Sequence, residues 1–337
     1  MDMKSDLFSF ALALTMTALL GVGAMPSCLA QTALSEATSK EASTEASNAT
    51  SKAASDSESQ SQAQSQSQSQ AQAQFSGQFF AGVSEAELAQ VFSKFQSCFV
   101  MLDLKRSKFH KINADLCSTR FSPCSTFKIF NSLVGLDTGV AKSERQVFAK
   151  KSESGLEEAQ TMQAAMTNSL VWYYQAMAEK IGMARMKHYL KKVPYGNADA
   201  TSGGGITRFW LGDSLKISPD EQVRFVADLV EDRLPFKTRS MAIVRGMMRL
   251  SENDKGILYG KTGSMMKDGK NELGWFVGYL VKPHGTYVFC TLIKAKDTSV
   301  DAGTPEDLQK QEDESNKAWG KQARKLTEEA LSKLGLW

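Results

Sequence analysis

A long stretch without large apolar side chains limits where this chain can fold. Residues 35–74 contain no Val, Ile, Leu, Met, Phe, Tyr, Trp or Cys, and they end in alternating Ser-Gln and Ala-Gln pairs. Such a composition buries too little apolar surface to offset the conformational entropy lost on ordering. We therefore expect 31–76 to be a disordered low-complexity tether, and 77–337 to form one large core or two tightly joined lobes.

The start of the chain has the features of a secretory leader. Residues 7–25 carry no charge and are nearly all apolar or small, and Cys28-Leu29-Ala30 follows with the small residues at which a leader peptidase cuts. We interpret 1–30 as a signal peptide, which predicts an exported, periplasmic protein after cleavage. Two alternatives stay open, because the apolar run is long enough for an uncleaved anchor and Cys28 offers a site for a lipid.

The charge of the remaining chain is modest. The sequence has 40 Lys and Arg against 37 Asp and Glu, and removing the three basic and seven acidic residues of 1–76 leaves 37 against 30, a formal +7. This excess suits a small anionic substrate, although a solvated surface explains it equally well. No basic run and no interleaving of basic with aromatic residues indicates nucleic acid.

Histidine and cysteine usage excludes several chemistries. The three histidines have no metal-ligand spacing, and the chain contains no G-x-S-x-G elbow, so we expect neither a metal nor a Ser-His-Asp mechanism. Export would permit disulfides. The four cysteines after the leader leave three pairings open: Cys98, Cys117, Cys124 and Cys290.

Periodicity predicts an α+β fold, with a helical lobe packed on a mixed helix and antiparallel-sheet lobe. We expect strands at 97–104, 256–261, 273–281 and 286–294, the last two joined by a turn at Lys282-Pro283-His284-Gly285. We expect helices at 125–139, 169–181, 184–193 and 318–334. Ser218-Pro219-Asp220-Glu221 is a capping box that opens a further helix through about residue 230.

One S-x-x-K element pairs a hydroxyl with an amine. Ser125 and Lys128 stand three apart at a predicted helix start, so the lysine can reach the serine proton. A desolvated lysine can activate a serine, and a helix N-terminus supplies amides for an oxyanion. By itself the motif is weak, because Ser125 could simply cap the helix and a second S-x-x-K occurs at Ser264–Lys267, in a predicted loop.

A K-T-G element makes the first motif more specific. Lys261-Thr262-Gly263 ends a predicted strand, where lysine and threonine offer a cation and a donor to a carboxylate and glycine lets a substrate backbone approach closely. Paired S-x-x-K and K-T-G elements occur in penicillin-binding proteins and class A β-lactamases, with S-D-N as a third element, which this chain lacks.

The order of the motifs resembles class D β-lactamases, the oxacillinases. That family has S-T-F-K, S-x-V, Y-G-N, W-L near SLKIS, K-T-G and a tryptophan-rich strand. The corresponding residues here are Ser125–Lys128, Ser169–Val171, Tyr195–Asn197, Trp210-Leu211 with Ser214–Ser218, Lys261–Gly263 and Gly274–Gly278. The match runs from about residue 99 to the C-terminus and implies the penicillin-recognising serine transpeptidase and β-lactamase architecture, with 77–337 as catalytic domain.

The resemblance implies a role for each matching residue. Ser125 would be acylated by a small-molecule β-lactam, and Lys128, carboxylated by CO₂ or bicarbonate, would be general base for acylation and deacylation. Ser169 and Lys261 would pass the proton to the leaving nitrogen. No other cofactor, metal or obligate protein partner is implied, and the activity would confer resistance to β-lactam antibiotics.

The remaining matching residues would support this chemistry. Their implied roles are apolar cover of the carbamate by Val171, a hydrogen bond to it from Trp210, an oxyanion hole from the amides of Ser125 and Ser264, substrate binding by Thr262 and Gly263, and shaping of the site by Tyr195 and Asn197. The family often binds the substrate carboxylate with an arginine of the last helix, for which Arg324 is the candidate here. Cys124 has no nearby histidine to activate it.

Two rivals share the fold. A β-lactam sensor domain is acylated and stays acylated. Such domains are parts of receptors that cross the membrane several times, whereas this chain has at most one apolar segment. A penicillin-binding transpeptidase usually has S-D-N and a larger chain. The rate of deacylation separates the three.

Overall fold

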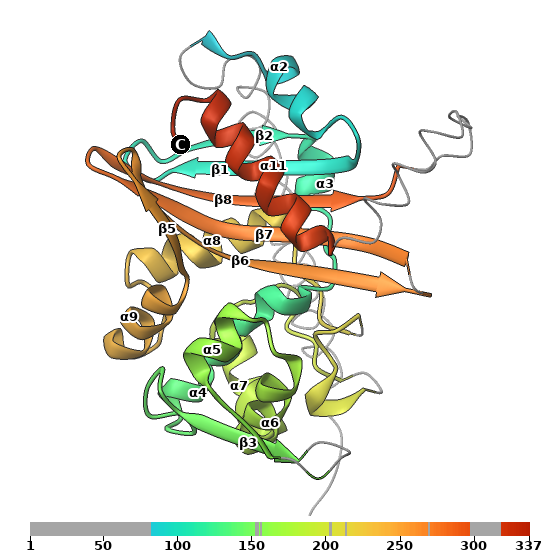
Figure 1. Cartoon of the computed structure of the whole chain (residues 1–337), viewed down its shortest axis with the longest axis vertical. Coiled ribbons are helices and arrows are strands. Elements are labelled where there is room, and N and C mark those ends of the chain that lie inside the picture. The colour runs from blue at the N-terminus through green and yellow to red at the C-terminus, as the bar shows by residue number, and fades with distance from the viewer. Residues whose placement is uncertain are drawn as a thin grey trace, which may run out of the picture. The chain divides into compact units, whose positions relative to one another are not determined.

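A six-stranded antiparallel sheet lies at the centre of the structure, a computed structural model that describes residues 82–151, 155, 157–201, 204–212, 214–268, 270–296 and 318–337. The expected leader and tether lie outside these residues. The strand order is β2-β1-β8-β7-β6-β5 (Figure 1). The strands are β1 (Gln96–Asp103), β2 (Lys108–Ile112), β5 (Arg249–Asn253), β6 (Gly256–Lys267), β7 (Lys270–Lys282) and β8 (Gly285–Lys294). Strand β1 pairs with β8, so the beginning and end of the domain share one sheet.

Helices cover both faces of this sheet. On one face lie α2 (Glu85–Ala89), the 3-10 helix η2 (Gln90–Phe92) and α11 (Trp319–Lys333), which crosses β7 in Figure 1. On the other face α8 (Pro219–Val230) packs against β1, β7 and β8. The helical lobe beyond it contains η3 (Cys124–Phe127), α4 (Lys128–Asp137), α5 (Met162–Thr167), α6 (Val171–Ile181), α7 (Met183–Lys192), η4 (Gly205–Thr207) and α9 (Thr238–Met247). A small hairpin, β3 (Val147–Lys151) with β4 (Glu157–Thr161), flanks this lobe, and α3 (Ala114–Ser118) follows β2.

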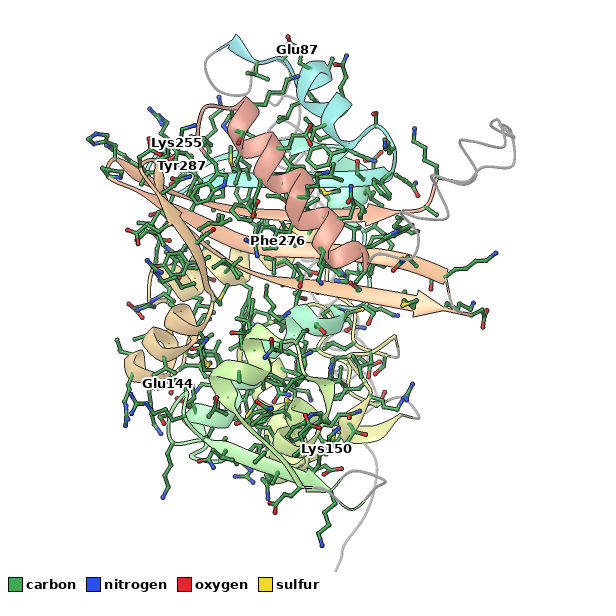
Figure 2. The ribbon with its side chains drawn as sticks, viewed as in Figure 1. Glu87, Glu144, Lys150, Lys255, Phe276 and Tyr287 are labelled. Carbon is green, nitrogen blue, oxygen red and sulfur yellow. A yellow bond between two sulfur atoms is a disulfide. The ribbon has the colours of Figure 1, made fainter. Side chains whose placement is uncertain are left out.

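The two-sided covering explains the apolar run of β1. Successive side chains of a strand point to opposite faces, and here Cys98 and Val100 join the core under the helical lobe while Phe99 and Met101 join the core under α11. Phe276 of β7 lies in this second core, between the sheet and α11 (Figure 2). Because both faces are buried, the consecutive residues 98–102 of this strand are all apolar.

The α+β prediction is confirmed, with several differences in detail. The strands expected at 97–104, 273–281 and 286–294 and the capping box of α8 are present. Strands β2 and β5 and helix α9 were not predicted, nor was the β3–β4 hairpin.

Cys98 and Cys117 form a disulfide that joins β1 to α3, while Cys124 and Cys290 are buried free thiols. Within the described residues, no helix has the length and apolar character needed to span a bilayer.

Candidate active site

The turn that carries Ser125 is tighter than the predicted helix 125–139. Residues Cys124–Phe127 form the 3-10 helix η3, and the α-helix begins only at Lys128. A 3-10 helix has three residues per turn, so positions i and i+3 eclipse. Lys128 therefore lies over Ser125, and its Nζ donates a hydrogen bond to the Ser125 Oγ at 2.7 Å. Cys124 enters this turn with a φ of 49°, a left-handed conformation uncommon outside glycine and often found at functional sites.

Lys128 is a buried amine with a lowered basicity. Only 1% of the residue is exposed, and burial, together with the positive charge of Lys261, lowers the pKa of Lys128 to about 7, although Cys124 opposes the shift. The low pKa leaves a large neutral fraction at physiological pH, and a neutral amine can accept a proton.

A second serine–lysine pair faces the first. Ser169 lies in the turn between α5 and α6 with a φ of 56°. The sequence predicted a helix that begins at this residue, but α6 begins only at Val171. The Nζ of Lys261 donates to the Ser169 Oγ at 3.0 Å and to the Thr262 carbonyl at 2.9 Å. Burial lowers the pKa of Lys261 to about 8, so this lysine still carries a charge at neutral pH.

The K-T-G element lies within a strand. Strand β6 continues to Lys267, so the predictions that Gly263 ends a strand and that Ser264–Lys267 is a loop are both wrong. Strand β5 pairs with β6 only as far as Tyr259. From Lys261 onward β6 therefore has β7 as its strand partner within the described residues, and backbone groups of its other edge are open to other partners.

Gly263 and Ser264 pack the strand between two other segments. A Cβ at Gly263 would lie 3.2 Å from the Pro123 carbonyl oxygen and 3.3 Å from the Thr126 nitrogen, so the glycine accommodates η3. The Ser264 hydroxyl accepts a hydrogen bond from the Gly320 N–H of α11 at 2.8 Å. Gly263 therefore has a packing role against η3. The sequence predicted only that this glycine lets a substrate approach closely.

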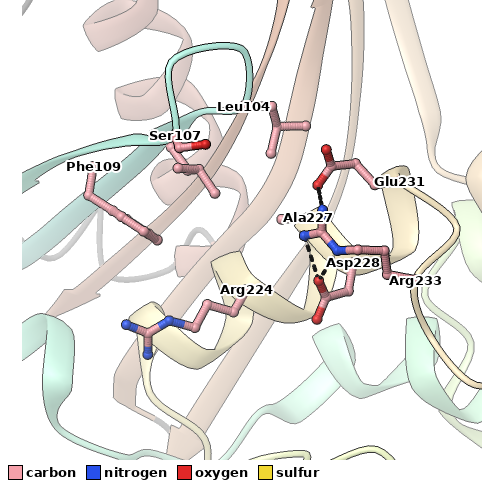
Figure 3. A pocket seen from close by; sticks show the side chains of 9 residues that line it. Leu104, Ser107, Phe109, Arg224, Ala227, Asp228, Glu231 and Arg233 are labelled. Atoms are coloured by element: carbon pink, nitrogen blue, oxygen red, sulfur yellow. Dashed lines mark hydrogen bonds and ion pairs between the residues drawn. The ribbon is translucent and has the colours of Figure 1, made fainter.

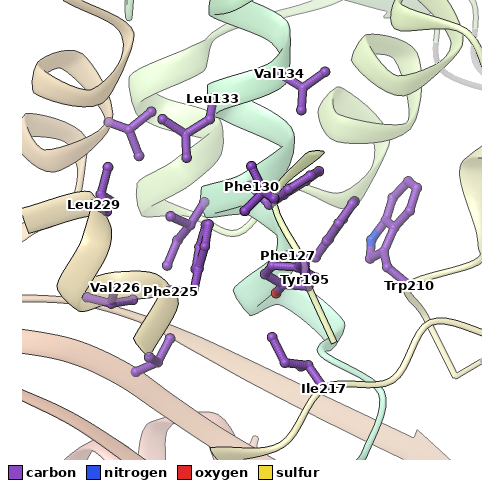
Figure 4. Close-up of a cluster of buried hydrophobic side chains, with 14 of the residues drawn as sticks. Phe127, Phe130, Leu133, Val134, Tyr195, Trp210, Ile217, Phe225, Val226 and Leu229 are labelled. Carbon is purple, nitrogen blue, oxygen red and sulfur yellow. The ribbon is translucent and has the colours of Figure 1, made fainter. Parts of the chain in front are cut away.

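An aromatic cluster packs around Phe127 of η3. Phe127 stacks on Trp210 with ring centroids 5.3 Å apart and meets Tyr195 edge-on at 5.7 Å (Figure 4). Burial raises the pKa of the Tyr195 hydroxyl, which neighbouring Thr126 and Gln222 lower by a smaller amount. These contacts place Trp210 beside the turn that leads to Lys128.

Asn197 joins the Y-G-N loop to the segment before α8. Its side-chain oxygen accepts from the Lys216 N–H at 2.9 Å and its amide donates to the Ser214 carbonyl at 2.8 Å. Gly196, with a φ of +58°, lies where a Cβ would be 2.0 Å from the Lys216 oxygen. Tyr195 and Asn197 therefore contact other parts of the fold, and their shaping of the site stays a prediction.

Val171 and Arg324 lie in positions that do not by themselves support their expected roles. Val171 is the first residue of α6 and is 37% exposed, so its cover of Lys128 stays a prediction. The Arg324 guanidinium pairs with Glu328 one turn later on α11 at 2.7 Å. Its binding of a substrate carboxylate would require that pair to open, and this role also stays a prediction.

Some supporting residues had no sequence signal. The Ser122 hydroxyl donates to the Trp210 carbonyl at 2.9 Å and accepts from the Gly212 N–H at 2.8 Å, joining η3 to the W-L segment. Gln222 of α8 donates to the Thr126 hydroxyl at 2.7 Å. Each of these bonds joins residues about 90 positions apart. Ser122 and Gln222 stand outside every motif of the sequence, so periodicity and spacing could not find them.

A separate hollow lies between the β1–β2 hairpin and α8 (Figure 3). Its volume is about 310 Å³, and its apolar lining includes Leu102, Leu104 and Phe109. Its charged lining includes Arg233, which forms ion pairs with Asp228 and Glu231. None of the residues that line it belongs to the two serine–lysine pairs. The described residues contain no cluster of His, Cys, Asp and Glu that could hold a metal ion.

Comparisons with known proteins agree with this geometry. Residues 53–311 match the family model for the penicillin-binding protein transpeptidase domain. The chain is 39% identical over 228 residues to the probable β-lactamase YbxI of Bacillus subtilis, covering 65% of this chain and 84% of that protein. It is 30% identical over 230 residues to the regulatory protein BlaR1 of Bacillus licheniformis, covering 66% of this chain but 38% of the relative. A crystal structure of a class D β-lactamase from Bacillus subtilis aligns with a TM-score of 0.63 at 35% identity, over 74% of this chain and 95% of that one.

Proposed function

Because the chain belongs to the class D serine β-lactamases, whose fold is that of the penicillin-binding transpeptidases, we propose that it hydrolyses the amide bond of β-lactams through an acyl-enzyme on Ser125. The observation that carries the proposal is the 2.7 Å hydrogen bond between the Ser125 hydroxyl and the buried Lys128 amine. A serine is a weak nucleophile until a positioned base takes its proton.

The groups of the site suit the acylation step. Lys128 accepts the proton of Ser125 as the Oγ attacks the lactam carbonyl carbon, and the amides of Ser125 and Ser264 stabilise the oxyanion. The lactam C–N bond then breaks, and its nitrogen receives a proton through Ser169, whose hydroxyl is held 3.0 Å from the Lys261 Nζ. The product of this step is an ester on Ser125.

The surroundings of Lys128 also suit its carboxylation by CO₂. A neutral amine is the form that combines with CO₂, and the pKa of about 7 leaves much of Lys128 neutral. The resulting negative charge would lie near the ammonium of Lys261, which offsets part of the cost of burying it. When bound, CO₂ supplies a carboxylate that can take a proton from Ser125 and later from water. Val171 and Trp210 would shield this group from solvent.

The surrounding chain suits an exported resistance enzyme. Cleavage after the leader would release the domain into the periplasm, where β-lactams meet their targets, and 31–76 would act as a tether with no part in the chemistry. The disulfide between Cys98 and Cys117 is compatible with an oxidising compartment. We assign the activity a role in resistance to β-lactam antibiotics.

A penicillin-sensing role is the second candidate, because the chain is 30% identical to the BlaR1 regulatory protein over 230 residues. Such a protein would be acylated at Ser125 in the same way but would keep its adduct. The two functions therefore differ in deacylation and not in the first step.

The test is turnover of a chromogenic cephalosporin by the full chain, in buffer stripped of CO₂ and then with bicarbonate restored. We expect many turnovers per molecule, slower without bicarbonate and restored by it. A single burst without turnover would favour the sensor. Turnover that ignores bicarbonate would reject the carboxylated lysine but leave Ser125 as the nucleophile.

A further inference from the structure

A chain of buried hydrogen bonds connects α8 to the turn that carries Ser125. The Gln222 Nε2 donates to the Thr126 Oγ1 at 2.7 Å, and this hydroxyl in turn donates to the Pro123 carbonyl at 2.7 Å. The Thr126 N–H donates to the same carbonyl at 3.1 Å. Gln222 and Thr126 are both fully buried. Because Ser125 lies between Pro123 and Thr126, these bonds hold the turn on either side of the nucleophile.

The same turn sets the distance between the nucleophile and the K-T-G strand. Gly263 meets the Pro123 oxygen and the Thr126 side chain, each at 3.2 Å from the position of a Cβ. A shift of the Thr126–Pro123 bond would therefore move Ser125 relative to β6, where the Ser264 amide and Lys261 lie. Displacements of about 1 Å in a catalytic arrangement can cost about 100-fold in rate.

The orientation of Thr126 depends on its partner from α8. A hydroxyl donates one hydrogen, and here the Gln222 amide occupies the acceptor side of Thr126, which leaves the hydroxyl proton directed to Pro123. The buried Tyr195 hydroxyl is a further neighbour of Thr126 and Gln222.

We propose that Gln222 is a positioning residue for acylation, acting through Thr126 to align Ser125 with Lys128 and with the K-T-G strand. Gln222 touches neither substrate nor the reacting atoms. This inference rests on the proposed acylation of Ser125, and it adds a residue from α8 that no motif of the sequence singles out.

The experiment measures acylation of the full chain by a fluorescent penicillin in rapid mixing. Gln222→Met keeps the length of the side chain but removes the amide donor, and we expect the first-order acylation rate constant to fall about 10-fold or more, with the half-saturating penicillin concentration little changed. The acylation rate constant of Thr126→Val should fall by a similar factor, whereas Thr126→Ser, which keeps the hydroxyl, should retain most of the rate. The Gln222→Met/Thr126→Val double variant should be no slower than the slower single variant, since both break one chain of bonds.

Thr327→Val is the matched control. The hydroxyl of Thr327, on α11, makes a buried hydrogen bond at 2.6 Å to that of Thr291, on β8, and neither residue belongs to η3 or α8. We expect it to lose stability to urea comparably to Gln222→Met but to acylate at the unmodified rate. The proposal is overturned if Gln222→Met acylates as fast as the unmodified chain, if Thr327→Val slows acylation equally, or if Thr126→Ser is as slow as Thr126→Val. Failure of the unmodified chain to become acylated would instead reject the proposed function.

Discussion

The two active-site lysines are chemically alike, yet their surroundings give them different roles. Both are buried, but the pKa of Lys128 falls to about 7 and that of Lys261 to about 8, because Lys128 also experiences the charge of Lys261. At neutral pH much of Lys128 is a free base while Lys261 is mostly an ammonium. One residue can therefore take a proton while the other supplies a positive charge.

This difference predicts the pH dependence of acylation. The ammonium form of Lys128 predominates below its pKa and can neither accept the Ser125 proton nor combine with CO₂. The acylation rate should therefore be low at pH 5.5 to 6 and should rise with a midpoint near about 7. The measurement is the rate of labelling by a fluorescent penicillin in buffers of constant ionic strength. A midpoint above pH 9, where an ordinary lysine loses its proton, would contradict the assignment of Lys128 as the base.

The adjacent cysteine gives a second test at the scale of residues. Burial raises the pKa of Cys124 to about 11, so its thiol is neutral and inert at pH 7. Ser125→Ala should abolish covalent labelling, whereas Cys124→Ala should leave turnover within a few-fold. Peptide mass spectrometry would locate the adduct, and finding it on Cys124 or Ser264 would overturn the assignment of Ser125.

At the scale of elements, the sequence predicted those whose signals are local. The apolar runs of β1, β7 and β8 and the capping box of α8 carry their pattern within a few residues. Strand β5 (RLSEN) is mostly exposed and polar, and β2 (KFHKI) has polar side chains at three of its five positions. Neither sequence therefore predicts a strand by itself, and both segments are strands because they pair with neighbouring strands. The 3-10 turn at Ser125 and the left-handed Ser169 were missed because tertiary packing determines them.

The Y-G-N loop allows a prediction about one glycine. Gly196→Ala would place a Cβ 2.0 Å from the Lys216 oxygen at a φ of +58°, so we expect a loss of about 3 kcal/mol in the free energy of unfolding. Gly139→Ala is the control, because Gly139 also has a positive φ, of +76°, but a Cβ there meets nothing within 4 Å. That variant should lose about 1 kcal/mol. Urea titration of both would refute the steric argument if the two losses were equal.

At the scale of the whole molecule, the active site joins segments that are distant in the sequence. Ser125 lies on η3, Ser169 precedes α6 and Lys261 lies on β6, and the fold brings them into two hydrogen-bonded pairs. The sequence order of the motifs predicted which residues take part. It could not supply the distances, or the contact of Gly263 with η3, since these depend on how the lobes pack.

The low-complexity segment leads to a prediction about the whole chain. Residues 35–74 lack the side chains needed to build or join a core, so a chain beginning at Ser76 should keep the turnover and the melting temperature of the full-length mature protein. Calorimetry and a chromogenic assay would measure both. A large loss of either would mean that this segment packs on the domain.

We expect Ser125 to form an ester with β-lactams and the same site to hydrolyse that ester. Intact-mass spectrometry after rapid mixing of the full chain with a penicillin, in bicarbonate buffer, follows the ester directly. We expect an adduct with the mass of the penicillin that maps to Ser125, appears within the first turnover and disappears as the substrate is exhausted, returning the unmodified mass. An adduct that persists after the penicillin is consumed, or that maps to another residue, would contradict it.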